Sequence, residues 1–528
     1  MCGFSVYTGG DKMLRLSVVS EFQKLKYRGP DNSVACDLGE KGWMGFHRLK
    51  IIDRTDDGNQ PLIYKNLHLV ANGEVYNYHS LMNEYRATYN FQSESDCEVI
   101  IPMVLELGML ETARRLDAEF VCVLYDSDHD KFLAARDPIG IRPMFYGYAS
   151  DGKIMFASEM KALSGLCEEV KPFPPGHIYD GDNFICFTDI AKVDRYTEDE
   201  MEVVYQKINE LLTKGVEKRL HADVPVGFLC SGGLDSSLVC AIAARVMDRP
   251  IRTFAVGIDL DPIDTKYAKT VADYLGAEHT EVLFTKQDIL DTLSTLIYNI
   301  ETYDITTIRA SMGMYLVSKY ISENTDIKVL MTGEISDEIF GYKYTDFAPT
   351  PQAFQKEAEK RLKEIYMYDV LRADRSISSN GLEARVPFGD LDFVKYIMSI
   401  PPEKKMNFTD IGKYILRKAF EGDYLPNDIL YREKAAFSDA VGHSMVDNLK
   451  AYAEEMYSDA DLLAAKKKYL HASPISKESL MYREIFESHF PGRSEVVVDF
   501  WMPNKEWDNC DVNDPSARVL PNYGKSGE

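Results

Sequence analysis

The stretch VPVGFLCSGGLDSS, residues Val224–Ser237, joins a continuous apolar run to a turn rich in Gly and Ser. A run such as Val224–Cys230 is typical of a strand buried on both faces of a parallel sheet, and the apolar stretch Ser236–Met247 predicts a helix. In such a unit the glycines let the backbone approach a phosphate, to which Ser hydroxyls and the helix N-terminus donate hydrogen bonds. Asp235 suits a phosphate loop only when a divalent cation neutralises its charge, so the stretch predicts a phosphate site with Mg²⁺. A purely structural strand–turn–helix junction is the alternative.

Strand and helix patterns alternate around this stretch. Apolar residues recur at helical spacing from Val204 to Leu220, and a strand at Arg252–Ile258, a helix at Thr265–Leu275 and a strand at Glu281–Phe284 follow. This alternation predicts an α/β nucleotide-binding domain with a parallel sheet. Helical patterns then predominate, which predicts a helical C-terminal part, and the composition of the last ~30 residues predicts a weakly ordered tail.

The first 190 residues have a different pattern, of short strands bounded by turns. Because strands and helices mix here without a regular βαβ alternation, we expect a sheet-rich sandwich covered by helices rather than a doubly wound sheet. The change of pattern places a boundary near residue 195, between domains 1–195 and 205–528. Strands are expected at Cys2–Tyr7, Met44–Ile52, Leu67–Glu74, Phe120–Tyr125, Phe132–Ala135 and Met144–Tyr148, and helices at Leu14–Tyr27 and Cys97–Leu107.

Composition narrows the class of protein. The 528 residues include 84 acidic residues against 60 Lys and Arg, so the formal net charge is -24. A surface that binds nucleic acid needs clustered Lys and Arg, so we expect no nucleic-acid partner. No apolar run reaches the ~18–20 residues that span a bilayer, and the first residues lack a targeting signal, so we expect a cytoplasmic protein without a membrane partner. The nine cysteines are scattered without a CxxC pair, which fits neither a disulfide framework nor a zinc site.

Cys2 differs from the other cysteines because of its position. Removal of Met1 would place the thiol beside a free α-amine, whose pKa near ~8 leaves part of it unprotonated at neutral pH. That amine could accept the thiol proton, so Cys2 would carry both the nucleophile and its base. A cysteine that merely follows Met is the alternative, and position alone favours it.

Further residues of the first half supply what an N-terminal cysteine amidase acting on glutamine would need. Arg48 offers a cation for the α-carboxylate, and Glu74 with Asp96 offers carboxylates for the α-ammonium. The Asn72 side chain and the Gly73 N–H could donate to the oxyanion. Each residue alone has an ordinary structural explanation, since Asn-Gly is common in turns and Arg is common on surfaces. Together they favour the amidase.

A second acidic stretch, Thr332–Glu338, follows the apolar run Val329–Met331. Its three carboxylates at a strand end suit a metal or ammonium site, although a helix cap alone would explain them. Asp337 could hold the same Mg²⁺ as Asp235 if the two loops converge.

In their order along the chain, these motifs resemble those of the glutamine-hydrolysing asparagine synthetases. The resemblance covers nearly the whole chain. Segments near Thr306 and Glu383 separate this family from amidotransferases that share only the first half, and from β-lactam synthetases, which lack the catalytic cysteine. The motifs are Cys2–Gly3, Arg28–Asp31, Asn72–Glu74, Arg136–Pro138, Phe156–Leu163, Ser231–Ser237, Ile300–Asp304, Thr306–Ser311 and Glu383–Phe388.

The resemblance implies an α+β N-terminal nucleophile-type sandwich (αββα) as the glutamine amidotransferase domain at 1–195. It implies an ATP-dependent synthetase domain at 205–528. Cys2 would release ammonia from glutamine, and β-aspartyl-AMP made from aspartate and ATP would receive it through a tunnel that keeps ammonia unprotonated. The products would be asparagine, AMP, pyrophosphate and glutamate. ATP is the implied co-substrate, Mg²⁺ the implied cofactor, and a homodimer the expected assembly.

The resemblance also assigns roles to single residues. Glu334 matches a glutamate of the ammonia step and Lys434 a lysine that neutralises charge on the phosphate, so both are expected to be catalytic together with Cys2, Asn72 and Gly73. Thr306 and Arg309 match the aspartate and adenylate site, and Asp235 and Asp337 the Mg²⁺ site. Glutamine binding is implied for Arg48, Leu49, Ile51, Asn72, Gly73, Glu74 and Asp96. Nucleotide binding is implied for Cys230, Ser231, Gly233, Asp235, Ser236, Ser237, Val256, Gly257, Asp264, Thr332 and Gly333.

The chain departs from the family pattern near the second acidic stretch. Ile335 and Tyr342 replace glycines that the family usually has, and Thr332 replaces a serine. A β-branched residue is costly where φ is positive, and it adds bulk near the proposed pyrophosphate. Two alternatives therefore stay open: an amide-forming ligase for another carboxylate, and a catalytically impaired or glutaminase-only relative. The Thr306–Ser311 segment argues against the first.

Overall fold

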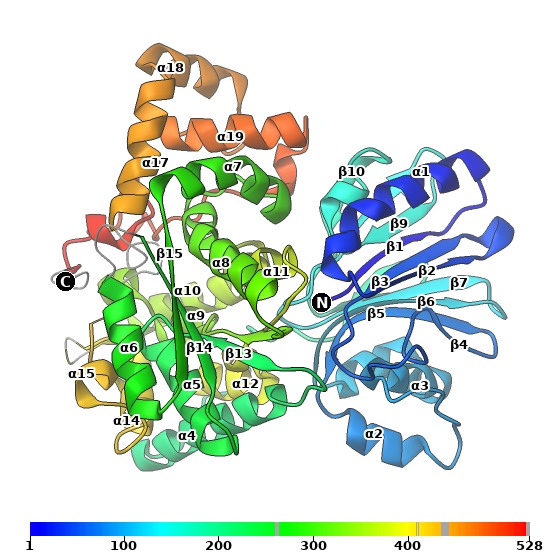
Figure 1. The fold of residues 1–528 in the computed structure, drawn as a ribbon, viewed down its shortest axis with the longest axis horizontal. Coiled ribbons are helices and arrows are strands. Elements are labelled where there is room, and N and C mark those ends of the chain that lie inside the picture. The colour runs from blue at the N-terminus through cyan, green and yellow to red at the C-terminus, as the bar shows by residue number, and fades with distance from the viewer. Residues whose placement is uncertain (259–262, 408, 410, 434–442, 524–528) are drawn as a thin grey trace. The chain divides into compact units, whose positions relative to one another are not determined.

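A computed structural model describes residues 1–258, 263–407, 409, 411–433 and 443–523, and of residues 258, 263, 264, 443 and 444 only the backbone. The chain forms two compact units (Figure 1). Unit 1 consists of Met1–Ile190 with two short segments from later in the chain, Ala222–Pro225 and Ser378–Glu383. Unit 2 consists of Ala191–His221, Val226–Ile377 and Ala384–Glu528.

Unit 1 contains two six-stranded antiparallel sheets. The first has the order β10-β8-β9-β1-β3-β2 and the second the order β12-β11-β7-β6-β5-β4. The strands of the first sheet are β1 (Gly3–Tyr7), β2 (Asn32–Asp37), β3 (Trp43–Arg48), β8 (Phe145–Ala149), β9 (Ile154–Ala157) and β10 (Cys167–Pro172). Those of the second are β4 (Leu62–Tyr64), β5 (Leu67–Val75), β6 (Ala118–Asp126), β7 (Lys131–Arg136), β11 (His177–Tyr179) and β12 (Phe184–Cys186).

Side chains of β6 show how these sheets are layered. Successive residues of a strand point to opposite faces, and in β6 Val121 and Val123 join a core cluster with Phe4 and Phe46 of the first sheet. Alternate residues, such as Cys122, join a cluster formed with helices α2 (Tyr78–Tyr85) and α3 (Ile100–Arg115). Helix α1 (Lys12–Phe22) packs on β1 and β3 of the first sheet. The predicted αββα sandwich is confirmed.

Unit 2 is built on a five-stranded sheet with the order β15-β14-β13-β16-β17, and its first four strands pair in parallel. Parallel strands leave their carboxyl ends at one edge of a sheet, and here Phe228 of β13 pairs with Met331 of β16. The loops that follow these strands therefore leave the sheet side by side. The strands are β13 (Val226–Leu229), β14 (Arg252–Ile258), β15 (Glu278–Phe284), β16 (Val329–Met331) and β17 (Glu383–Arg385).

Helices make up most of the rest of unit 2, as predicted. Helices α17 and α19 pack together and against α7, and α18 packs on α19 (Figure 1). The described helices are α4 (Met201–Arg219), α5 (Leu234–Val246), α6 (Ile263–Leu275), α7 (Lys286–Ile300), α8 (Ile305–Asn324), α9 (Ser336–Phe340), α10 (Pro351–Glu364), α11 (Asp369–Ser378), α12 (Leu391–Ser399), α13 (Pro402–Lys405), α14 (Tyr414–Ala419), α15 (Asn427–Leu430), α17 (His443–Met456), α18 (Asp459–Lys468) and α19 (Lys477–His489).

The segment predicted as a weakly ordered tail is instead packed as far as residue 523. Trp507, Cys510 and Leu520 form a core cluster with Tyr344 and Phe354. The composition of this segment, rich in Pro, Asn and Asp, concealed the aromatic residues that anchor it. The prediction was wrong because a few large apolar side chains are enough to hold a loop without helix or strand.

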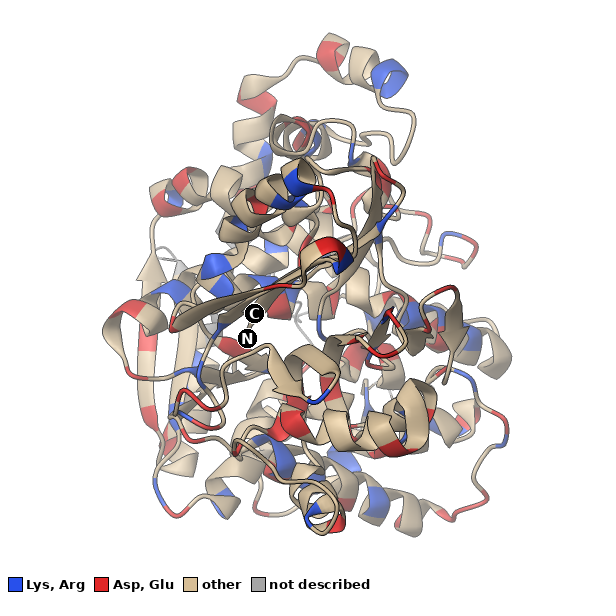
Figure 2. Cartoon of the chain, turned by 90° about the vertical axis from the view of Figure 1, so that its right-hand side faces the viewer, with Lys and Arg blue, Asp and Glu red and all other residues tan. Residues whose placement is uncertain are grey.

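Charged residues of both signs are interspersed along the helices and loops of the described chain (Figure 2). Many form exposed ion pairs, such as Lys41 with Asp130, which contribute little to stability. Among the described residues no helix is long and apolar enough to cross a membrane.

Arg28 is the cation of a buried polar cluster in unit 1. Its Nη1 lies 2.5 Å from Glu159 Oε1 and 2.9 Å from Ser378 Oγ, and neither charged side chain is exposed. Its Nε donates to the Cys2 carbonyl at 2.9 Å. Removing one member of such a pair leaves an uncompensated buried charge, which costs more than the pair itself contributes.

Replacement of Arg28 by Met should lower the free energy of unfolding by about 3 kcal/mol, because Glu159 would keep its charge in a buried site. Hydrogen exchange of the β1 and β3 amides under increasing urea measures the loss. The matched control is Arg15→Met, which removes a pair with Asp37, whose side chain is 62% exposed. This control should change stability by less than about 1 kcal/mol. Equal losses in both variants would contradict the dependence on burial.

Candidate functional site

Cys2 lies immediately before β1 and is held by contacts from three segments of unit 1. Its backbone N–H donates to Asn72 Oδ1 at 2.8 Å, and the Leu49 N–H lies 3.4 Å from its Sγ. Burial raises the pKa of the Cys2 thiol above its ordinary value, although the N-terminal ammonium and the Leu49 amide lower it. The Met1 ammonium lies 3.2 Å from Glu383 Oε2. A buried thiol of raised pKa needs a nearby base to become a nucleophile.

Asn72 and Gly73 lie next to each other on β5, beside Cys2. The Asn72 Nδ2 is buried and has no hydrogen-bond partner within the described part of the chain. A Cβ at Gly73 would lie 2.2 Å from the Glu119 carbonyl oxygen, so only glycine fits there. A buried amide donor without a partner is costly, and a ligand oxygen would satisfy it.

The other residues predicted to bind glutamine are buried around the same strands. Asp96 Oδ2 accepts a hydrogen bond from the Val75 N–H at 2.7 Å, at the end of β5. Arg48 holds the loop that follows β3, donating to the Thr55 carbonyl at 2.7 Å and to Asn59 Oδ1 at 3.0 Å. Strand β3 ends at Arg48 rather than at Ile52, where the sequence predicted its end. Leu49, Ile51, Glu74 and Asp96 are all buried.

Unit 2 contains a cavity of about 560 Å³ at the carboxyl edge of its sheet. The cavity brings together most of the residues predicted for nucleotide, aspartate and metal: Cys230, Ser231, Gly233, Asp235, Ser236, Val256, Thr306, Arg309, Thr332, Gly333, Glu334 and Asp337. Ser237 and Gly257 are buried but do not line it. Lys434 and the side chain of Asp264 lie outside the described residues.

The loop Ser231–Ser237, here called the phosphate-type loop, is held together by hydrogen bonds of its own serines. Ser231 Oγ lies 3.0 Å from Ser236 Oγ, and the Gly233 N–H donates to Ser231 Oγ at 3.3 Å. Gly232 has φ of +71°, and a Cβ there would lie 2.6 Å from the Ala268 backbone nitrogen. A Cβ at Gly333 would lie 2.9 Å from the Ser236 nitrogen, so the second loop packs directly on the first.

Lys413 contacts both the phosphate-type loop and the acidic stretch Thr332–Glu338. Its Nζ lies 2.8 Å and 2.9 Å from the two carboxylate oxygens of Asp235, 2.6 Å from Asp337 Oδ1 and 2.9 Å from Ser336 Oγ. The two loops therefore converge, and the cation between them in this structure is the Lys413 ammonium. Carboxylate and hydroxyl oxygens are also the ligands that Mg²⁺ prefers, so the donor set fits the expected metal. Among the described residues no group of three or more His, Cys, Asp or Glu side chains surrounds a common point.

Residues that line this cavity also carry buried polar atoms without hydrogen-bond partners among the described residues. Arg372 Nη2 lies 3.3 Å from one Glu334 oxygen, while the other oxygen has no hydrogen-bond partner in the described structure. The buried hydroxyls of Thr306 and Thr332 also have none among the described residues. A cavity that buries unsatisfied donors and acceptors is suited to a polar ligand.

Ile335, which stands where the family usually has glycine, adopts a left-handed backbone conformation with φ of 81°. Strain of this kind costs about 1–2 kcal/mol. The side chain is only 1% exposed, and burying an isoleucine contributes about 1.5–3 kcal/mol, so burial offsets the strain. Tyr342 lines the cavity after Gly341.

Sequence reasoning missed several residues of the cavity wall. Lys413 lies in the turn before α14 and Arg372 lies within α11, and nothing local marks their charges as buried. Trp501 and Ser516 lie in the segment predicted to be a tail. Only the pair of tryptophans, Trp501 and Trp507, signalled that this segment packs.

Comparisons with known proteins agree with this division into two halves. A family model described as asparagine synthase matches residues 207–351 and 346–513, and one described as a glutamine amidotransferase domain matches residues 1–178. A probable asparagine synthetase (glutamine-hydrolyzing) of Acanthamoeba polyphaga mimivirus is 41% identical over 99% of this chain and 100% of its own length. The chain belongs to the glutamine-hydrolysing asparagine synthetases.

Other members of this family have similar identity. The asparagine synthetase (glutamine-hydrolyzing) of Mus musculus is 37% identical over 99% of both chains. Asparagine synthetase (glutamine-hydrolyzing) 3 of Arabidopsis thaliana is 41% identical over 93% of this chain and 88% of its own. Family membership confirms the predicted enzyme class, an ATP-dependent ligase with a glutamine amidotransferase half.

In this synthetase, Gly232→Ala should weaken ATP binding at least about tenfold, because the new Cβ cannot fit without moving the phosphate-type loop. Calorimetric titration with ATP measures the change. Gly276→Ala is the matched control, since Gly276 also has positive φ, +64°, but a Cβ there would meet nothing within 4 Å. Its ATP affinity should equal that of the parent, and a loss of affinity in both variants would contradict the steric argument.

Proposed function

We propose that this chain makes asparagine from aspartate, with ATP as the energy source and glutamine as the nitrogen donor. Domain 1–195 would act as the glutaminase and domain 205–528 as the synthetase. The observation that carries the proposal is the presence, in one chain, of Cys2 beside Asn72, whose Nδ2 has no partner among the described residues, and of a cavity where a phosphate-type loop meets an acidic loop. A cytoplasmic location and a homodimer are part of the proposal.

In the glutaminase reaction, removal of Met1 would turn the Cys2 backbone nitrogen into an α-amine that takes the thiol proton. The thiolate attacks the side-chain amide carbon of glutamine, and the Asn72 Nδ2 and the Gly73 N–H donate to the oxyanion. The C–N bond then breaks, and the nitrogen leaves as ammonia with the proton that the α-amine returns. Water hydrolyses the thioester to glutamate and frees the thiol.

Glutamine would be recognised at its other end by charge. Arg48 supplies positive charge for the α-carboxylate, and Glu74 and Asp96 supply negative charge for the α-ammonium. The buried side chains of Leu49 and Ile51 would form apolar walls. Because these groups are already held by the β3 and β5 segments, little of them needs to be ordered when glutamine binds.

In the synthetase reaction, a β-carboxylate oxygen of aspartate attacks the α-phosphorus of ATP, and the bond to pyrophosphate breaks. Ammonia then attacks the acyl carbon of β-aspartyl-AMP, AMP leaves, and Glu334 accepts the proton lost from nitrogen. Lys434 would neutralise charge on the phosphate. Thr306 and Arg309 line the part of the cavity assigned to aspartate and the adenylate. The nucleotide would contact Cys230, Ser231, Gly233, Asp235, Ser236, Ser237, Val256, Gly257, Asp264, Thr332 and Gly333.

Asp235 and Asp337 would hold Mg²⁺. When bound, the metal would neutralise the charge of the phosphates and of the leaving pyrophosphate. In the structure Lys413 lies between the same two carboxylates. Its position in the present structure supports this assignment, because the two carboxylates already share one cation.

A product assay tests the proposal directly. The chain is incubated with aspartate, ATP and Mg²⁺ and with either glutamine or ammonia, and asparagine and AMP are measured. Both donors should yield asparagine. ATP–pyrophosphate exchange with a panel of carboxylates accompanies it, and exchange with a carboxylate other than aspartate would favour the ligase alternative. A chain that hydrolyses glutamine without making AMP would be a glutaminase only.

Cys2→Ala should abolish glutamine-dependent synthesis and leave ammonia-dependent synthesis within about twofold of the parent, because adenylation does not use the thiol. Asparagine formation with each donor is measured by chromatography. Cys36→Ala, a half-buried cysteine of the same unit, is the matched control and should keep both activities. Loss of both activities in a folded Cys2→Ala protein would contradict the division of labour.

Removal of divalent cations with EDTA should stop asparagine formation with either donor but leave glutamine hydrolysis unchanged. Asp337→Asn should raise the Mg²⁺ concentration for half-maximal synthesis by about tenfold, because one anionic ligand is lost. Asp326→Asn, an exposed aspartate of the same unit, is the control. Identical Mg²⁺ titrations for the two variants would remove Asp337 from the metal site.

A further inference from the structure

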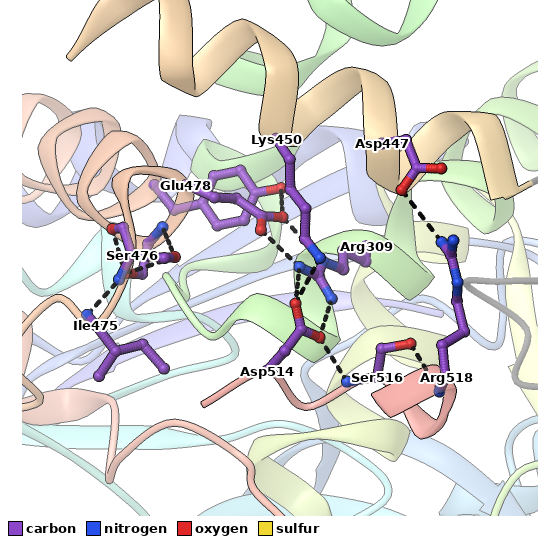
Figure 3. A network of polar contacts seen from close by, with 11 residues as sticks. Arg309, Asp447, Lys450, Ile475, Ser476, Glu478, Asp514, Ser516 and Arg518 are labelled. Carbon is purple, nitrogen blue, oxygen red and sulfur yellow. Dashed lines mark hydrogen bonds and ion pairs between the residues drawn. The ribbon is translucent and has the colours of Figure 1, made fainter. Parts of the chain in front are cut away.

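Arg309 lines the cavity of unit 2, yet its nitrogen atoms are occupied by two carboxylates (Figure 3). Its Nε and Nη2 donate to Glu478 of α19 at 2.8 Å and 2.6 Å. Its Nη1 and Nη2 donate to Asp514 at 2.9 Å and 3.1 Å. The side chain is only 2% exposed. A guanidinium has five N–H donors, and four of them are used here, so little of it is left for a substrate.

Asp514 is held from three directions. Besides Arg309, Lys450 of α17 lies 2.7 Å from Asp514 Oδ2, and the Ser516 N–H donates to Oδ1 at 2.8 Å. Burial alone would raise the pKa of Asp514, but the bonds from Arg309 and Lys450 bring it below its ordinary value. Asp514 is therefore an ionised anchor at neutral pH.

The chain after Asp514 forms one wall of the cavity. Pro515, Ser516, Ala517 and Asn522 all line it. Ala517 and Leu520 belong to the core cluster that also contains Tyr344 and Trp507.

The far end of this segment is fastened to the loop that carries Tyr342. Asn522 Nδ2 donates to the Lys343 carbonyl at 2.7 Å, and Lys343 Nζ donates to the Asn522 carbonyl at 3.2 Å. The wall is thus tied at both ends, to Arg309 through Asp514 and to the loop after Gly341 through Asn522.

The asparagine synthase family model matches as far as residue 513, just before this wall, whereas the alignments with full-length relatives cover 99% of the chain. We propose that Asp514–Tyr523 is a specificity-determining wall of the synthetase cavity, and that Arg309 is a positioning residue that fixes it through Asp514. This inference rests on the proposed function.

The position of the wall indicates which substrate it serves. Ser516 lies on the same cavity as Thr306, one turn of α8 from Arg309. Thr306 and Arg309 belong to the part assigned to aspartate, whereas the phosphate-type loop lies on β13 and α5. A displaced wall would therefore change the fit of aspartate, and the reacting phosphate would keep its own ligands.

The central test is Asp514→Asn, which keeps the shape of the side chain and removes its charge. The KM for aspartate in the ammonia-dependent reaction should rise about tenfold or more, while kcat should change less than roughly threefold. Hydrogen exchange of the amides of residues 516–523 should become faster. Asp514→Glu, which restores the charge, should return most of the lost aspartate affinity.

Asp447→Asn is the matched control, because Asp447 pairs with Arg518 in the same network but is 57% exposed (Figure 3). It should leave both kinetic constants unchanged. Lys450→Met keeps the Arg309 pair and should raise the KM for aspartate by less than Asp514→Asn does. This second variant keeps the proposal testable if Asp514→Asn does not fold.

Two outcomes would overturn the inference. A loss of kcat at unchanged KM would mean that the pair supports the chemical step rather than the wall. A lower KM for aspartate would mean that Asp514 competes with a substrate carboxylate for Arg309. The parent chain is assayed first, so that failure to make asparagine at all counts against the proposed function and not against the wall.

Discussion

The parallel pairing of β13 with β16 is the constraint on which the synthetase half depends. It leaves the carboxyl ends of both strands at one edge, so the loops after them meet although 101 residues separate Ser336 from Asp235. Their meeting places two carboxylates in a cavity where unpaired charge would be costly. The single ammonium of Lys413 contacts both carboxylates. Gly333 permits the close approach of the two loops because it has no Cβ. The acidic and phosphate-type loops thus form a single site only through the order of strands in the sheet.

Charge compensation also holds the walls of the cavity. In a chain of net charge -24, three arginines of the cavity are paired with carboxylates. Arg372 contacts Glu334, Arg309 contacts Glu478 and Asp514, and Arg361 contacts Glu357. Such pairs contribute little net stability, but breaking one is costly, so they specify which segments lie together. Unit 1 follows the same rule on a smaller scale with Arg28 and Glu159.

The local sequence pattern predicted strands made of continuous apolar residues and missed strands with polar or alternating residues. The continuous apolar runs became β6 and β13, because both faces of these strands are buried. Strands β2 and β10 carry alternating or polar residues and lie at sheet edges, so their sequences resemble turns. The C-terminal segment was predicted as a tail because its composition is polar, whereas two tryptophans and Leu520 pack it into a core. For Ile335 the sequence indicated backbone strain. Only the packing of the folded chain revealed the burial that offsets this strain.

The sequence by itself determined the αββα and α/β classes, the family, and the residues that carry the expected chemistry. These follow from neighbours a few positions apart, since strand, turn and helix each leave a short-range pattern. Tertiary structure alone decided that Lys413 lies between Asp235 and Asp337, that the Asn72 Nδ2 beside Cys2 has no partner in the described part of the chain, and that Arg309 is occupied by Asp514. The physical reason is that such contacts join segments far apart in the chain, and sheet order and side-chain packing select them rather than the local sequence.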